Sequence, residues 1–252
     1  MKIGIFDSGI GGLTVLKGAL ELLPQEDYIY FADTGHAPYG IKPKEEVKAY
    51  IYQAADFIAG KGVKALVVAC NTATSVAIGD LRDRFDFPVI GMEPAVKPAV
   101  ERNGGKRVLV AATPLTLKED KFQDLVEKVD VENMVDVLPL PELVEYAERF
   151  VFDDQVVIPY LKEKLAEYDT GLYGTVVLGC THFPFFKEQF ARVFEEGTGI
   201  IDGSGGTVKR LKNVLAERGL GRAQGGTGGI EFYSSIGDRA ESGRFMKYLS
   251  RL

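Results

Sequence analysis

The chain is poor in the residues that build disulfides and metal sites, since its 252 residues include only two cysteines and two histidines. Two cysteines cannot form a disulfide framework, and no secretion signal precedes the first apolar run. We therefore expect a protein of the reducing cytoplasm with free thiols. No group of these residues has the spacing of a zinc ligand set, so no metal is expected.

Long apolar runs and net positive charge are also missing. No run approaches the ~20 residues of a membrane span, so a membrane partner is not expected. The formal charge is −6 and the sequence pI is near 5.2, which is a poor starting point for binding nucleic acid. Hydrophobic residues make up 46% of the chain, enough to bury a core. These absences favour a globular protein that acts on a small molecule.

Short apolar runs alternate with segments of helical period along the chain. Continuous apolar strands separated by amphipathic helices are typical of a parallel sheet covered on both faces, so an α/β fold is predicted. Strands are expected at residues 3–6, 28–32, 65–69, 89–91, 107–112, 135–138, 175–178, 199–201 and 230–234. Helices are expected around residues 13–23, 47–58, 71–85, 115–128, 155–168, 185–195, 206–218 and 238–249.

The two halves of this pattern resemble each other. Residues 65–72 (ALVVACNT) and 175–182 (TVVLGCTH) each end an apolar strand on a cysteine followed by polar residues. The likeness is short, and chance in strand-rich sequence is the alternative to duplication. We expect two similar doubly wound parallel-sheet domains with the active site in the cleft between them. The first would hold residues 1–94 and 207–252, and the second residues 95–206.

Four polar turns occupy residues 7–9, 38–40, 70–72 and 180–182, at or after predicted strand ends. Ligands of open parallel sheets bind outside the carboxyl ends of the strands. Three of the turns are also expected to open a helix, whose free N–H groups suit a small anion. The glycine-rich segment 7–12 lacks the G-x-G-x-x-G spacing and a Walker lysine, and Asp7 would repel phosphate, so a nucleotide is not expected.

The two cysteines, Cys70 and Cys180, are the main candidates for chemistry. A free cysteine usually behaves as a small buried hydrophobe, which is the alternative to a functional role. Here both occupy the same structural place, and a thiol before a helix N-terminus has a lowered pKa. We therefore predict a paired acid and base. His182 is a candidate proton partner, and His36 is expected to be a loop residue at the rim of the pocket.

Four separated motifs carry a resemblance to a known family: residues 6–13 (FDSGIGGL), 38–40 (PYG), 69–73 (ACNTA) and 178–184 (LGCTHFP). Together they resemble glutamate racemases of the aspartate/glutamate racemase superfamily. The resemblance implies a cofactor-independent, two-base interconversion of L- and D-glutamate that supplies D-glutamate for peptidoglycan. It also implies a homo-oligomer, commonly a dimer, with glutamate as the small-molecule partner.

The resemblance also implies roles for individual residues. Cys70 would handle the proton of D-glutamate and Cys180 that of L-glutamate, with Asp7 and His182 as auxiliary acid–base groups. Glu148 falls where the family has a third auxiliary group, although Glu145 is a neighbouring alternative. The substrate-binding positions would be Asp7, Ser8, Pro38, Tyr39, Gly40, Asn71, Thr72, Thr113, Thr116, Thr181 and His182.

One loop departs from the family pattern, because Thr34-Gly35-His36 stands where many members have Thr-Ala-Arg. This departure bears on substrate tuning and leaves the thiol chemistry unchanged. Three other functions stay open from the sequence: a sister racemase acting on aspartate or another amino acid, a dicarboxylate-binding protein with structural thiols, and a hydrolase that uses only Cys180 and His182.

Overall fold

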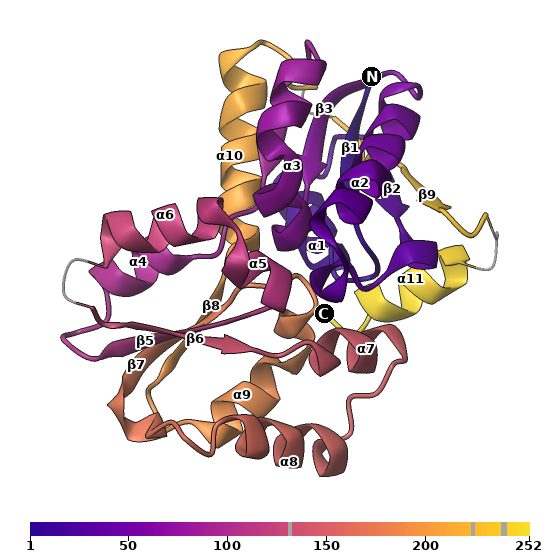
Figure 1. The fold of residues 1–252 in the computed structure, drawn as a ribbon. Coiled ribbons are helices and arrows are strands. Elements are labelled where there is room, and N and C mark those ends of the chain that lie inside the picture. Colours follow the sequence, from indigo (N-terminus) through magenta and orange to yellow (C-terminus); the bar gives the residue numbers. More distant parts are fainter. Residues whose placement is uncertain (131–132, 223–224, 238–240) are drawn as a thin grey trace.

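The computed structural model describes residues 1–130, 133–222, 225–237 and 241–252. It contains two parallel sheets, each covered by helices, and the sheets lie in separate parts of the molecule (Figure 1). The first sheet has the order β4-β3-β1-β2-β9 and the second has the order β6-β5-β7-β8. The α/β fold with two doubly wound domains, predicted from the alternation of strands and helices, is confirmed.

The first sheet is built from apolar strands that are buried on both faces. Every residue of β2 and β3 is buried, so their continuous apolar sequence matches their place in the sheet. Helices α1, α10 and α11 share one hydrophobic core with this sheet, while α2 and α3 share a second core. The strands are β1 (Lys2–Asp7), β2 (Tyr28–Ala32), β3 (Val63–Val68), β4 (Val89–Gly91) and β9 (Ile230–Ser234). The helices are α1 (Leu13–Leu22), α2 (Lys44–Ala59), α3 (Asn71–Arg84), α10 (Ser204–Glu217) and α11 (Glu241–Leu249).

The second sheet repeats this arrangement with four strands, all paired in parallel. Its strands are β5 (Arg107–Ala112), β6 (Val135–Pro139), β7 (Tyr173–Leu178) and β8 (Gly199–Asp202). Its helices are α4 (Val96–Glu101), α5 (Pro114–Lys118), α6 (Asp120–Val129), α7 (Glu142–Glu148), α8 (Asp154–Lys164) and α9 (Lys187–Val193). Strands β3 and β7, which precede the two cysteines, therefore hold equivalent places beside β1 and β5.

The C-terminal segment returns to the first sheet. Strand β9 pairs in parallel with β2, helix α10 packs on α1, and α11 contacts both β9 and α1. The polypeptide thus crosses between the sheets twice, after β4 and after β8. These crossings touch, because a Cβ on Gly203 would lie 2.4 Å from the backbone oxygen of Glu93. The domain limits at residues 94/95 and 206/207 stay a prediction.

Two predicted helices are wrong in detail. The helix expected at residues 115–128 is broken at Glu119, whose extended backbone (φ −74°, ψ 135°) separates α5 from α6. The Glu119 side chain forms an ion pair with Lys44 at 2.7 Å, a contact invisible to helical periodicity. The helix expected at 185–195 begins instead as a 3₁₀ turn, Phe183–Phe186, before α9. The predicted start of the last helix, residues 238–240, lies outside the described residues.

None of the helices that the structure describes is long and apolar enough to cross a membrane.

Candidate active site

Cys70 lies between the end of β3 and the start of α3. It is the N-cap of this 14-residue helix, and its Sγ accepts a hydrogen bond from the backbone N–H of Ala73 at 3.4 Å. The Oγ of Ser8, from the turn after β1, lies 3.6 Å from the same sulfur. The thiol is 5% exposed. Cys70 therefore lies between a strand end and a helix start, as predicted from the sequence. Its sulfur has one backbone partner and one hydroxyl partner.

The predicted net lowering of this thiol's pKa is wrong, although the helix N-terminus itself acts in the predicted direction. Burial, and after it the nearby carboxylate of Asp7, raise the pKa of Cys70 to about 12. The Ala73 N–H and the Ser8 hydroxyl act in the opposite direction but are outweighed. A helix N-terminus lowers a thiol pKa when the thiol is partly solvated, whereas desolvation disfavours the thiolate here. Cys70 is consequently held as a protonated thiol.

Cys180 follows β7, in the place equivalent to that of Cys70. The turn after it does not open an α-helix as expected, because residues 183–186 form a 3₁₀ turn that begins at Phe183. The partner of this thiol is a side chain, since Sγ lies 3.8 Å from Nδ1 of His182. Both residues are buried, with exposed fractions of 6% and 1%. The two thiols therefore share a topological place but have different surroundings.

Glu148, the last residue of α7, lies behind His182. Its Oε1 is 2.8 Å from Nε2 of His182 and accepts the backbone N–H of Ile10 at 2.8 Å. Burial lowers the pKa of His182, but its bonds to Cys180 and Glu148 outweigh burial and raise this pKa well above its ordinary value. Burial likewise opposes ionisation of Glu148, yet His182 and the Ile10 N–H hold the pKa of this carboxyl below its usual range. We call Glu148, His182 and Cys180 the triad.

Glu145, the alternative to Glu148, is exposed and lines a neighbouring cavity of about 330 Å³. The structure therefore brings Glu148, and not Glu145, into contact with His182.

Asp7, the last residue of β1, is fully buried. It lies between the groups that surround Cys70 and those that surround Cys180. Its Oδ1 accepts the N–H of Gly9 at 2.9 Å, and its Oδ2 accepts the hydroxyl of Thr181 at 3.0 Å. Burial raises the pKa of Asp7 to about 6, while His182 and these hydrogen bonds oppose the rise. Asp7 is thus a carboxyl that can change its protonation state near neutral pH.

Three threonine hydroxyls meet between segments that follow strands of different sheets, β3 and β5. Thr72 is the second residue of α3, Thr113 is the N-cap of α5 and Thr116 lies within α5. Their oxygens lie 3.0, 3.0 and 2.9 Å apart in the three possible pairs. Asn71 donates from Nδ2 to the backbone oxygen of Met92 at 3.2 Å, and its buried Oδ1 has no hydrogen-bond partner in the described part of the chain. The site thus contains hydroxyl donors and one unused acceptor.

The loop after β2 holds the remaining predicted residues. The Tyr39 hydroxyl donates to the carboxylate of Asp33, which also lies 2.7 Å from Nδ1 of His36. The His36 ring stacks on Tyr50 with a centroid separation of 3.8 Å. Pro38 lines the 330 Å³ cavity together with Glu148, while Gly40 is buried against Thr113. His36 therefore supports the loop from the side of α2.

Glycine at position 9 lets the backbone of the turn after β1 come close to Glu148. A Cβ on Gly9 would lie 1.8 Å from Oε1 of Glu148, so any larger residue there would displace this carboxylate. The glycine-rich segment, which lacks the spacing of a nucleotide-binding turn, thus admits the Glu148 carboxylate to the backbone of the first domain.

The model of the Asp/Glu/hydantoin racemase family matches residues 12–211. The chain belongs to this family. It is 56% identical over 252 residues to a curated glutamate racemase of Halothermothrix orenii, covering 100% of this chain and 99% of that one. It is 57% identical over 238 residues to glutamate racemase 2 of Bacillus subtilis, covering 93% and 89%.

Solved structures of racemases show the same fold. A Francisella tularensis glutamate racemase in complex with D-glutamate matches with a TM-score of 0.85 at 30% identity, covering 99% of this chain and 93% of that one. An Escherichia coli glutamate racemase in complex with L-glutamate and the activator UDP-MurNAc-Ala matches with a TM-score of 0.84 at 30% identity, covering 99% and 94%. The resemblance drawn from the sequence motifs is confirmed.

Some residues at this candidate site carried no signal in the sequence. Arg244 of α11 donates to Glu148, although the two are 96 positions apart. The Tyr30 hydroxyl donates to the backbone oxygen of Gly9 at 2.7 Å and supports the turn after β1. Asp33 anchors Tyr39. Arg244 and Tyr30 act through tertiary contacts, so no local motif could have identified them, whereas Asp33 lies in the same loop as Tyr39.

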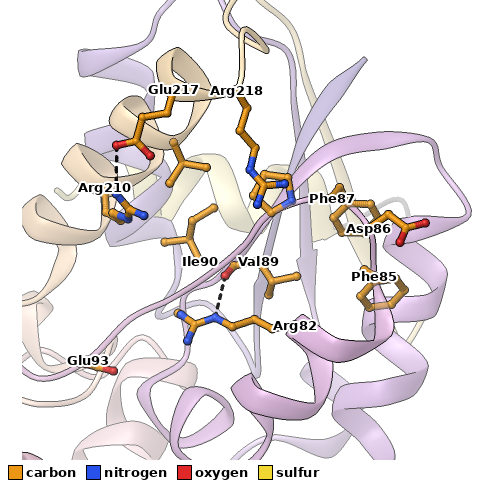
Figure 2. Close-up of a pocket in the computed structure, with 13 residues that line it drawn as sticks. Arg82, Phe85, Asp86, Phe87, Val89, Ile90, Glu93, Arg210, Glu217 and Arg218 are labelled. Atoms are coloured by element: carbon orange, nitrogen blue, oxygen red, sulfur yellow. Dashed lines mark hydrogen bonds and ion pairs between the residues drawn. The ribbon is translucent and has the colours of Figure 1, made fainter.

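A larger cavity of about 760 Å³ is lined by other residues than those of the candidate site. The end of α3, strand β4 and helix α10 form its walls, and Arg82, Arg210 and Arg218 lie around it (Figure 2). None of the predicted catalytic or substrate-binding residues lines it. Cavity size alone would have pointed to the wrong part of the molecule.

Proposed function

We propose that this protein catalyses the interconversion of L- and D-glutamate with Cys70 and Cys180 as its two proton-transfer groups. The observation that carries the proposal is the placement of two buried thiols at equivalent strand ends of two facing domains, each with its own hydrogen-bonding partners. Family membership and the glutamate racemases that match along nearly the whole chain support it. D-Glutamate supplied in this way would serve peptidoglycan synthesis.

In the L-to-D direction, Cys180 would remove the proton from Cα. The Cα–H bond breaks and an S–H bond forms, while the electron pair passes toward the α-carboxylate. The S–H bond of Cys70 then breaks as its proton reaches the opposite face of Cα. The raised pKa of Cys70 suits this delivery, because the sulfur waits as a thiol. The reverse direction exchanges the two roles.

The surrounding polar groups would bind the substrate and the developing charge. The buried, unpaired Oδ1 of Asn71 can accept a bond from the substrate ammonium group. The hydroxyls of Thr72, Thr113 and Thr116 can donate to a carboxylate once their mutual bonds are exchanged for bonds to the ligand. Ser8, Pro38, Tyr39, Gly40 and Thr181 complete the proposed binding surface. Fixed donors in a buried site stabilise an anion more strongly than water does.

The first test measures loss of the Cα proton signal by NMR in deuterated water, with polarimetry to follow racemisation. L-Glutamate and D-glutamate should both exchange and racemise, and aspartate should react far more slowly. Faster reaction of aspartate would favour the sister racemase. Absence of exchange from any amino acid, together with unchanged glutamate binding in Cys70→Ser and Cys180→Ser, would favour the binding protein.

A hydrolase would depend on Cys180 and His182 alone. It predicts that Cys70→Ser keeps full activity, whereas the two-thiol proposal predicts loss in both variants.

Two further properties belong to the proposal. We infer a cytoplasmic enzyme, because thiol acid–base chemistry needs reduced cysteines, and both cysteines are free. We also infer a homodimer, following the family resemblance. Light scattering behind size-exclusion chromatography tests this assembly, and a monomer at micromolar concentration would contradict it.

A further inference from the structure

The C-terminal helix α11 reaches the triad from the side of the first domain. Nη2 of Arg244 donates to Oε2 of Glu148 at 2.6 Å and to the backbone oxygen of the same residue at 3.0 Å. The other carboxylate oxygen, Oε1, faces His182 and Ile10. One oxygen of Glu148 is therefore held by the first domain's terminal helix while the other bonds the imidazole.

Helix α11 is fixed in place independently of Arg244. Phe245 and Tyr248 are 0% and 1% exposed, and the Phe245 ring packs against Tyr30 with centroids 5.5 Å apart. The Tyr248 hydroxyl donates to the backbone oxygens of Ala147 at 2.7 Å and Glu148 at 3.1 Å, at the end of α7. The helix lies beside α7 (Figure 1). Arg244 is consequently presented to Glu148 by a helix that is docked through the buried side chains of Phe245 and Tyr248.

The pair is well placed to influence the carboxylate. The Arg244 side chain is 26% exposed and that of Glu148 is 14% exposed, so water screens the pair only partly. A charged hydrogen bond of this kind fixes the carboxylate's rotamer as well as its charge. Without it, Glu148 could turn toward the adjoining 330 Å³ cavity, which it lines together with Arg244 and Arg149.

We propose that Arg244 is a positioning residue for catalysis: it holds Glu148 against His182 and so completes the Cys180 side of the site. This inference rests on the proposed racemase function. Glu148 follows a strand of the second sheet, whereas Ile10 and α11 belong to the first domain's side, so two of its partners come from across the cleft. Glu148 therefore has all of its hydrogen-bond partners only when the two domains are together.

Arg244→Met tests this role, since it removes the guanidinium and keeps an apolar stem. Loss of one charged hydrogen bond to the carboxylate should lower kcat about tenfold. L- and D-glutamate have equal free energies, so kcat/KM must fall equally in both directions in any variant. The side affected has to be identified from the substrate isotope effect.

The isotope effect on kcat/KM should rise for α-deuterated L-glutamate, whose label is removed by Cys180. It should not rise for α-deuterated D-glutamate, whose label is removed by Cys70. Arg244→Lys, which keeps a cation, should recover part of kcat and show the same pattern more weakly. It also serves as the test variant if Arg244→Met does not fold.

Lys247→Gln is the matched control. This change removes a cation from the same helix. The Nζ of Lys247 lies 3.6 Å from the Phe150 ring centroid. It should leave kcat and both isotope effects unchanged.

Unchanged kcat in Arg244→Met and Arg244→Lys would overturn the inference. So would a loss of activity in which both isotope effects move together, because that pattern indicates a loosened cleft. In either case the wild-type protein would still racemise glutamate, whereas failure of the proposed function would appear as an inactive wild type.

Discussion

The two thiols occupy equivalent places in two similar domains, yet their surroundings differ. Cys70 caps an α-helix and contacts a backbone N–H and the Ser8 hydroxyl. Cys180 has only a 3₁₀ turn after it and relies on His182, backed by Glu148. One half controls its sulfur through the backbone and burial, and the other through a charged triad. Similar topology therefore positions a reactive group without determining how its proton is controlled.

The largest expected effect removes either sulfur. Cys70→Ser and Cys180→Ser should each lower kcat by roughly 10³-fold or more, because a hydroxyl is a far weaker acid–base group than a thiol. The double variant should be about as inactive as either single variant, since the two sulfurs act on one substrate carbon. Discontinuous racemisation assays measure kcat of all three variants. Multiplicative losses in the double variant would mean that the thiols act independently.

The next largest effect distinguishes the Cys180 side of the site from the Cys70 side. His182→Asn should lower kcat about 10²-fold, because it removes the imidazole that faces Cys180. The matched change is His36→Asn, which removes the other imidazole of the chain from its place against Asp33 and Tyr50. Steady-state kinetics of both variants should show a far smaller loss for His36→Asn. Equal losses of kcat in the two variants would show that the triad has no particular role in catalysis.

The negative charge of ionised Asp7 should destabilise the folded state. Its pKa in the folded protein is raised from 3.8 to about 6 by burial, so the folded state binds the proton more tightly than the unfolded state. The contribution to stability is complete below the unfolded pKa and is lost as pH rises through about 6. At neutral pH the buried charge then costs about 3 kcal/mol of folding free energy.

Asp7→Asn should accordingly raise the free energy of unfolding by about 1–3 kcal/mol at pH 7.5, less whatever the amide loses in hydrogen bonds. The gain should shrink toward zero between pH 6 and pH 4, while racemase activity falls at every pH. Urea unfolding across this range checks the sign. A gain that grows as pH falls would show that the pKa of Asp7 is not raised.

The smallest expected effect comes from Ser8, the hydroxyl partner of Cys70. Ser8→Ala removes an oxygen 3.6 Å from the sulfur of Cys70, a long and weak contact. Activity should fall about two- to tenfold, as for loss of one neutral hydrogen bond. Initial-rate assays in both directions measure it. A loss as large as that of His182→Asn would mean that the two sides depend on their side chains equally.

The sequence was sufficient for the features that depend on local pattern. Apolar strands and polar turns placed both cysteines at strand ends, and the order of motifs along the chain indicated the family. It could not show that Glu119 interrupts a helix, because that break accompanies an ion pair with Lys44. Nor could it give the raised pKa of Cys70, which depends on how completely the domains exclude water. Arg244 was missed because helix α11 meets Glu148 only in the folded protein.

The contact between Gly203 and Glu93 has a consequence for the relative placement of the two sheets. Both connections of the second sheet to the rest of the molecule pass through this one place. A residue larger than glycine at position 203 would have to push the two crossings apart, because its Cβ would meet the backbone oxygen of Glu93. Such a substitution should shift the second sheet, and the Cys180 that follows β7, relative to the first sheet.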